Sequence, residues 1–120
     1  MRNQPKYNFF KNTSYALKGL VDIISNEKSF KIELIFALVL VPALFFIDLS
    51  IIEKLLLFIT LMQVLVAESI NSAIERVVDL VTKEYHPMAG RAKDVGSSVV
   101  FLSIAIACST WFFVIYSNFF

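Results

Sequence analysis

The stretch LLLFITLMQVLVAESI, residues 55–70, is an apolar run that carries an acidic residue near its end. Glu68 lies inside the run, and Glu75 and Asp79 follow it seven and eleven positions later. An ionisable side chain at membrane depth is costly, and it is retained where it faces a protein interior, a water-filled cavity or a bound cation. The stretch therefore predicts a membrane helix that carries a functional site.

The composition is that of a membrane protein. Hydrophobic residues make up 58% of the 120-residue chain, the mean hydropathy is +0.71, and the charged residues are clustered. A spanning helix needs about 20 residues, so the chain has room for only a few spans and one surface segment. We expect one all-α membrane domain over residues 1–120, with a surface helix at about 8–25 and spans at about 28–47, 52–82 (including a cytoplasmic extension) and 92–117.

Each expected span has its own features. Pro42 is expected to kink the first span. The second pattern continues helically until His86 and Pro87, so this helix should extend well out of the bilayer. The third span is rich in Ser and Ala, which allow helices to approach closely in lipid.

Residues 8–25 show the pattern of an amphipathic helix at the membrane interface. Its apolar side is formed by Phe9, Phe10, Leu17, Leu20, Val21 and Ile24, and its polar side by Asn8, Lys11, Tyr15, Lys18, Asp22 and Ser25. The helix could be a simple membrane anchor, or its polar side could contribute to a site. Asn26 is the expected N-cap of the next helix, which would place Glu27 in the first turn.

The placement of Lys and Arg predicts the topology. Six of the eleven precede the first span, four lie between the second and third spans, and one joins the first and second. The positive-inside rule then puts the N-terminus and residues 74–94 in the cytoplasm, and the C-terminus on the opposite side.

The polar residues of the second span share one side of the helix, within a stripe about 100° wide. They are Glu68, Asn71, Ser72, Glu75 and Asp79. Glu68 and Glu75 are roughly 10 Å apart along an ideal helix, too far to bind one magnesium ion together. Their roles should therefore differ.

Glu75 is expected near the cytoplasmic interface, where Glu27 could approach it and form a magnesium site with substrate phosphates. Glu68 lies deeper, where its carboxylate could accept a proton from a lipid hydroxyl during phosphoryl transfer. The alternative is a purely structural polar network in which these groups pair with Arg76, Lys83 or the backbone.

The segment EYHPMAGRAKDVGSS, residues 84–98, is expected to include a basic loop that leads into the third span. Arg91 and Lys93 are candidates for binding phosphate oxygens. Gly90 and Gly96 permit a close backbone approach, and Asp94 could accept a hydrogen bond from a ribose or orient a lysine. The basic residues could instead be only a topology signal. The one histidine, His86, has no second histidine beside it for a zinc site, and no Walker motif is present.

The run AESINSAIERVVDLV at 67–81, followed by residues 84–98, resembles the prokaryotic integral-membrane diacylglycerol kinase family. The resemblance covers nearly the whole chain, including YALKGL at 15–20 and the Asn26-Glu27 pair. It implies ATP- and magnesium-dependent phosphorylation of diacylglycerol to phosphatidic acid in the bacterial inner membrane. It also implies a homotrimer of helical bundles whose active sites are shared between protomers, with no nucleic-acid partner.

By position, the resemblance makes Glu68 the general base and Glu27 and Glu75 the magnesium ligands. The positions it implies for ATP are Tyr15, Glu27, Glu75, Glu84, Tyr85, His86, Lys93 and Asp94, with Asn71, Asp79, Gly90 and Arg91 in support. The positions it implies for lipid are Glu68, Ser97, Glu33, Phe30 and Lys31.

Two positions depart from the family pattern. Asn8 stands where the family can use an arginine against ATP, which leaves two alternatives: Lys6 or Lys11 takes its place, or the contact is absent. Leu17 replaces a tryptophan found in some members. Neither change affects the carboxylates.

Two other functions remain open. Undecaprenol kinase has the same fold, although Asn71-Ser72 and the GRAKDVGSS segment look more like the diacylglycerol branch. A small cation-coupled transporter or a membrane assembly subunit could also use a polar stripe, but it would leave the RAKD cluster at 91–94 unexplained.

Overall fold

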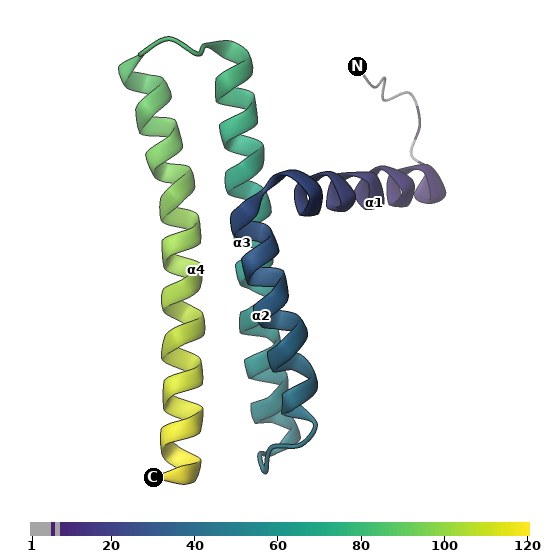
Figure 1. The fold of residues 1–120 in the computed structure, drawn as a ribbon, viewed down its shortest axis with the longest axis vertical. Helices are drawn as coiled ribbons and strands as arrows, with labels where there is room; N and C mark the ends of the chain where they lie inside the picture. Colours follow the sequence, from purple (N-terminus) through teal and green to yellow (C-terminus); the bar gives the residue numbers. More distant parts are fainter. Residues whose placement is uncertain (1–5, 7) are drawn as a thin grey trace.

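The computed structural model describes residues 6 and 8–120, and the secondary structure in this part of the chain is entirely helical. The helices are α1 (Phe9–Asn26), α2 (Lys28–Leu44), α3 (Ile51–Val81) and α4 (Pro87–Phe119). The last three lie lengthwise beside one another, while α1 runs across them and away from the bundle (Figure 1). Arg2, one of the cations used to predict topology, lies outside the described residues.

Helix α1 begins at a side-chain cap. The Asn8 side chain accepts a hydrogen bond from the Lys11 backbone N–H at 3.0 Å, so the residue that departs from the family pattern serves here as the N-cap. The expected cap at the other end was wrong. Asn26 is the last residue of α1, and its amide donates back to the Asp22 carboxylate at 2.8 Å, so Glu27 is the N-cap of α2.

Helix α2 is shorter than the predicted first span, since it ends at Leu44 and not at residue 47. Pro42 lies two residues before this end and has no N–H to continue the hydrogen-bond ladder. The next backbone groups form tighter bonds, from Phe45 N–H to the Pro42 carbonyl and from Phe46 N–H to the Ala43 carbonyl. Pro42 thus lies in the last turn of the helix.

Helix α3 is a single uninterrupted helix close to its predicted bounds. It starts with a capping box that the sequence analysis missed, in which Ser50 accepts from the Glu53 N–H and Glu53 accepts from the Ser50 N–H. The Glu53 carboxylate also accepts a hydrogen bond from Asn118 of α4 at 2.6 Å. This end of α3 is therefore tied to the end of α4.

Helix α4 begins at Pro87, about five residues before the predicted start of the third span at residue 92, so part of the segment expected as a basic loop is helical. Proline is favoured in the first turn of a helix, because its missing N–H has no helical partner there. His86 acts as the N-cap, and its Nδ1 accepts from the Met88 N–H at 3.1 Å. The basic residues of this segment consequently lie on a helix.

The α3–α4 contact depends on small residues. Gly96, Ser103 and Ala107 are the buried residues of α4, and they let α4 approach α3 closely. Midway along the contact, the Gln63 amide donates to the Ser103 carbonyl at 2.6 Å, and Trp111 Nε1 donates to the Thr60 hydroxyl at 3.1 Å. These bonds fix the register of the two helices.

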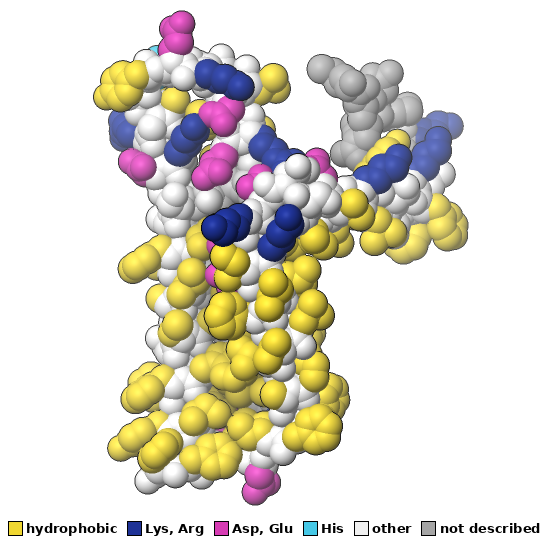
Figure 2. Space-filling model, viewed as in Figure 1, with side chains coloured by type: hydrophobic (Ala, Val, Ile, Leu, Met, Phe, Trp, Pro, Cys, Tyr) yellow, Lys and Arg dark blue, Asp and Glu magenta, His cyan; other side chains and the backbone are white. Residues whose placement is uncertain are grey.

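Charged and apolar side chains separate along the molecule. Acidic and basic side chains gather over the α1–α2 corner and the neighbouring ends of α3 and α4, whereas apolar side chains cover most of the rest (Figure 2). By length and composition, α4 is the one helix in the described residues that could cross a membrane. Three spans remain a prediction for α2, α3 and α4 together.

Candidate active site at the acidic stripe of α3

The polar stripe of α3 passes from a buried end to an exposed end. Glu68 and Ser72 are buried, at 8% and 7% exposure, and Asn71 and Glu75 are half-buried. Asp79, one turn beyond Glu75, is exposed. A carboxylate is rarely buried without a partner or a function, so Glu68 is the residue of the stripe that most requires an explanation.

Three further carboxylates lie close enough to Glu68 to interact with it electrostatically. Glu75 belongs to the same helix, Glu33 lies on α2, and Glu27 lies at the α1–α2 corner. Like charges this close repel one another, and a cation between them would relieve the repulsion. The structure therefore gathers acidic groups from separate chain segments around one buried carboxylate.

Asn71 connects the stripe to α4. Its amide donates to the Glu75 carboxylate at 3.4 Å, while its Oδ1 is buried and has no hydrogen-bond partner among the residues that the structure describes. Gly96 lies opposite, and a Cβ atom at residue 96 would fall 2.5 Å from that oxygen. Gly96 therefore lets α4 pass beside Asn71, whereas a Cβ atom at Gly90 would meet no described atom within 4 Å, so the close approach is seen at one of the two glycines.

Arg76 binds two carboxylates at the α1–α2 corner. Its guanidinium donates to Asp22 of α1 and to Glu27, each at 3.1 Å. The hydrogen bond from Arg76, together with one from Asn26, holds the pKa of the Asp22 carboxyl below its usual range. The pairing with Arg76 that the structural alternative anticipated is thus real for Glu27, and the structure does not extend it to Glu68.

A second ion pair joins α3 and α4 at their charged ends. Lys93 donates to the Asp79 carboxylate at 2.7 Å, and both side chains are exposed. The hydrogen bond lowers the pKa of Asp79 and raises that of Lys93. Two residues expected near the nucleotide are therefore in direct contact.

Glu27 and Glu75 carry carboxylates, the type of side chain that magnesium binds. Within the described residues no three Asp, Glu, His or Cys side chains form a group that could hold a metal ion. Magnesium is commonly bound by one or two carboxylates together with substrate phosphates and water, so Glu27 and Glu75 are a sufficient protein contribution. The Glu27 Oε1 is held by Arg76, and the Glu75 Oε1 accepts from Asn71.

The residues expected to contact ATP fall into two separate regions. Glu84, Tyr85 and His86 lie exposed between α3 and α4, and Asp94 is exposed near the start of α4. Tyr15 lies on α1, which leaves the bundle on the side away from α4 (Figure 1). One chain therefore does not bring all these positions together.

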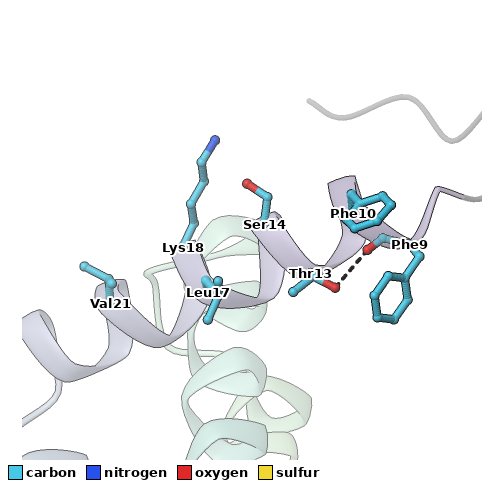
Figure 3. Close-up of a pocket in the computed structure, with 7 residues that line it drawn as sticks. All are labelled: Phe9, Phe10, Thr13, Ser14, Leu17, Lys18 and Val21. Carbon is cyan, nitrogen blue, oxygen red and sulfur yellow. Dashed lines mark hydrogen bonds between the residues drawn. The ribbon is translucent and has the colours of Figure 1, made fainter.

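The positions expected to contact lipid differ in their exposure. Lys31 and Ser97 are exposed and Glu33 is half-buried, but Phe30 is buried at 4% exposure within the chain. The surface of α1 carries an apolar depression lined by residues of that helix alone (Figure 3). Its lining residues are Phe9, Phe10, Thr13, Ser14, Leu17, Lys18 and Val21. None of them belongs to the acidic stripe.

Fold and site together define a helical membrane protein with a buried carboxylate beneath a charged surface. The model of the family "Prokaryotic diacylglycerol kinase" matches residues 14–115. The chain belongs to this family, and it is accordingly a lipid kinase and a membrane protein.

Several relatives have established names. The chain is 39% identical over 109 residues to diacylglycerol kinase of Escherichia coli strain K12, covering 91% of this chain and 89% of the relative. It is 39% identical over 100 residues to diacylglycerol kinase of Haemophilus influenzae, covering 83% and 85%. It is also 33% identical over 100 residues to undecaprenol kinase of Bacillus subtilis, covering 83% and 81%. Membership favours a kinase over the transporter and assembly-subunit alternatives.

The Asn71–Gly96 approach gives a first prediction. Gly96→Ala would place its Cβ 2.5 Å from Asn71 Oδ1 and 3.4 Å from Ile74 Cγ2. Because either α4 or the Asn71 side chain must then move, we expect a loss of about 1–3 kcal/mol in stability together with reduced kinase activity. Thermal unfolding in detergent and a turnover assay measure the two effects.

Gly19→Ala is the matched control, because no atom lies within 4 Å of the corresponding Cβ position in α1. Alanine is the better helix former, so this variant should unfold at the wild-type temperature or slightly above it. Equal thermal stability of the Gly96→Ala variant and the wild-type protein would show that Asn71 does not constrain α4.

Proposed function

We propose that the protein transfers the γ-phosphoryl group of ATP to the hydroxyl of diacylglycerol, giving phosphatidic acid at the cytoplasmic face of the membrane. The observation that carries the proposal is the buried Glu68 carboxylate within an otherwise apolar part of α3, with three other carboxylates near it. A lipid hydroxyl can reach this depth from the bilayer, while a nucleotide can approach the charged end of the bundle.

Glu68 acts as the general base. As the hydroxyl oxygen of diacylglycerol forms its bond to the γ-phosphorus, the proton passes to the Glu68 carboxylate and the bond to the oxygen of the leaving ADP breaks. The phosphoryl group transfers directly, without an intermediate on the protein. Positioning and charge stabilisation supply most of the catalysis in such reactions, and both depend on the fixed α3–α4 and α2–α3 contacts.

Glu27 and Glu75 hold magnesium, each with a different neighbour that orients it. Arg76 donates to Glu27, and Asn71 donates to Glu75. When bound, magnesium neutralises phosphate charge that the surrounding carboxylates would otherwise repel. Lys93 offers a further positive charge for the nucleotide, and Asp79 directs it through their ion pair.

The active form is a homotrimer in which neighbouring protomers complete each site. The separation of Tyr15 on α1 from Lys93 on α4 supports this assembly, because one chain presents them on opposite sides of the bundle (Figure 1). Extensive exposed apolar surface on α2, α3 and α4 also supports contacts with lipid and other protomers.

The protein spans the bacterial inner membrane three times, through α2, α3 and α4, with α1 lying at the cytoplasmic surface. The charged cap over the α1–α2 corner and the α3–α4 turn supports this orientation (Figure 2). The C-terminus of α4 is at the far end from that cap (Figure 1). The polar stripe then opens toward cytoplasmic ATP.

Undecaprenol is the second candidate substrate, since a relative in Bacillus subtilis is named undecaprenol kinase. The 39% identity to relatives named diacylglycerol kinase, against 33% to that enzyme, favours diacylglycerol.

The two substrates can be compared directly. With purified protein, magnesium-ATP and either short-chain diacylglycerol or undecaprenol in the same detergent, we expect phosphatidic acid to form at the higher kcat/KM. Incorporation of the labelled γ-phosphate into extracted lipid measures both reactions. Preferential phosphorylation of undecaprenol would reassign the substrate.

Replacement of the proposed base gives a third prediction. Glu68→Gln removes the proton acceptor while keeping the shape of the side chain, so turnover should fall by roughly two to four orders of magnitude. The oligomeric state, measured by light scattering in detergent, should not change.

Glu53→Gln is the matched control, since it alters a carboxylate of α3 at the end remote from the stripe and glutamine also serves in a capping box. This control should retain near wild-type turnover. Wild-type turnover by the Glu68→Gln variant would refute the general-base role.

A further inference from the structure

The Arg76 side chain joins α3 to the end of α1 and to the α1–α2 corner. It follows Glu75 directly in α3, and its guanidinium binds Asp22 in the last turns of α1 and Glu27 at the corner itself. A guanidinium is planar and presents several donors in a fixed fork, so it can hold two carboxylates in a defined relation.

The corner has little else to fix its geometry by packing. Ile23 is the buried residue of α1, and most of the other described side chains of that helix are exposed. Glu27 has extended backbone angles, φ −111° and ψ 111°, and serves as the C-cap of α1 and the N-cap of α2. The direction of its carboxylate therefore depends on how α1 sits against α3.

Hydrogen bonds and the peptide bond between Asn26 and Glu27 together form a closed ring at the corner. Asn26 donates to the Asp22 carboxylate at 2.8 Å and to the Asp22 carbonyl at 3.0 Å, and its chain neighbour is Glu27. Arg76 then connects Asp22 to Glu27 from α3. Movement of α1 away from α3 would break the Arg76–Asp22 bond, so the two Arg76 bonds couple the position of α1 to that of Glu27.

The positive charge of Arg76 also favours the observed position of the Glu27 carboxylate. Glu27 and Glu75 both lie near Glu68, and these acidic groups repel one another in the protein. Arg76 places a positive charge between the Glu27 and Asp22 carboxylates, and of the two Glu27 oxygens it binds Oε1. A carboxylate has two oxygens with about four acceptor sites, so Glu27 can bind a cation while Arg76 holds it.

We propose that Arg76 is a positioning residue that ties the α1–α2 corner to α3 through Asp22 and so orients the Glu27 carboxylate toward Glu75 for magnesium. The inference rests on the proposed function, because it concerns the metal that the kinase reaction requires. Arg76 of α3 and Asp22 of α1 bind no ligand themselves in this proposal. They hold the magnesium-binding carboxylate in place.

The first readout is the magnesium requirement. Arg76→Ala should raise the magnesium concentration for half-maximal turnover roughly three- to tenfold, a range that allows for the partial exposure of the pair. Asp22→Asn should shift it in the same direction, and the double variant should show less than the combined effect. Arg76→Lys, which keeps the charge without the fork, should lie between the wild-type protein and Arg76→Ala.

The second readout needs no nucleotide, metal or turnover. Spin labels at Ser14→Cys on α1 and Ser98→Cys on α4, in a Cys108→Ser background, report the distance between these helices. The doubly labelled chain is diluted with unlabelled protein so that distances within one protomer dominate. Arg76→Ala and Asp22→Asn should broaden the distribution, because α1 loses its tie to α3.

Lys54→Ala is the matched control, since it removes a positive charge from α3 at the end away from the corner. It should change neither readout. Broadening together with a higher magnesium requirement in both Arg76→Ala and Asp22→Asn supports the proposal, and any other result with these two variants contradicts it. Absence of magnesium-dependent turnover in the wild-type protein would instead overturn the proposed function.

Discussion

The burial of Glu68 is the constraint on which the rest of the structure depends. A carboxylate at 8% exposure within an apolar helix is stable only in an environment built for it. α2 contributes Glu33 to that environment, the α1–α2 corner contributes Glu27, and α3 adds Glu75. The positions of α2, α3 and the α1–α2 corner therefore bear on the properties of one side chain.

The fold fixes this environment by fastening α3 at both ends. At one end the capping box of Ser50 and Glu53 and the Asn118 hydrogen bond hold α3 to the terminus of α4. At the other end Lys93 from α4 binds Asp79, and Arg76 binds the α1–α2 corner. Between the ends, small residues of α4 allow a close α3–α4 contact. The result is an apolar helical bundle with a charged surface at one end, an arrangement suited to a reaction between a lipid and a nucleotide.

Periodicity and composition predicted the four helical segments and the shared side of the acidic stripe well. These features are local, because apolar spacing along the chain determines them. The errors were at the helix ends: Asn26 caps nothing in α2, and Pro87 starts α4 where a loop was expected. Such positions depend on small competing hydrogen bonds, like the one from Asn26 to Asp22.

The Arg76 bridge carried no sequence signal that could have identified it as a link to Asp22. The two residues are 54 positions apart, and only the fold brings them together. The roles of Glu68, Glu27 and Glu75, by contrast, were predicted from depth, spacing and family resemblance, and they stay predictions. Their chemical roles depend on ligands that bind between them.

The central claim is that Glu68 serves the lipid hydroxyl while Glu27 and Glu75 serve the metal-bound nucleotide. Electron paramagnetic resonance of manganese, used in place of magnesium with a non-hydrolysable ATP analogue, separates these roles without turnover. The account predicts that the Glu68→Gln variant binds manganese-nucleotide as the wild-type protein does, and that Glu27→Gln and Glu75→Gln each weaken binding severely. Equal loss of binding in the Glu68→Gln variant, or undiminished binding in the other two, would contradict it.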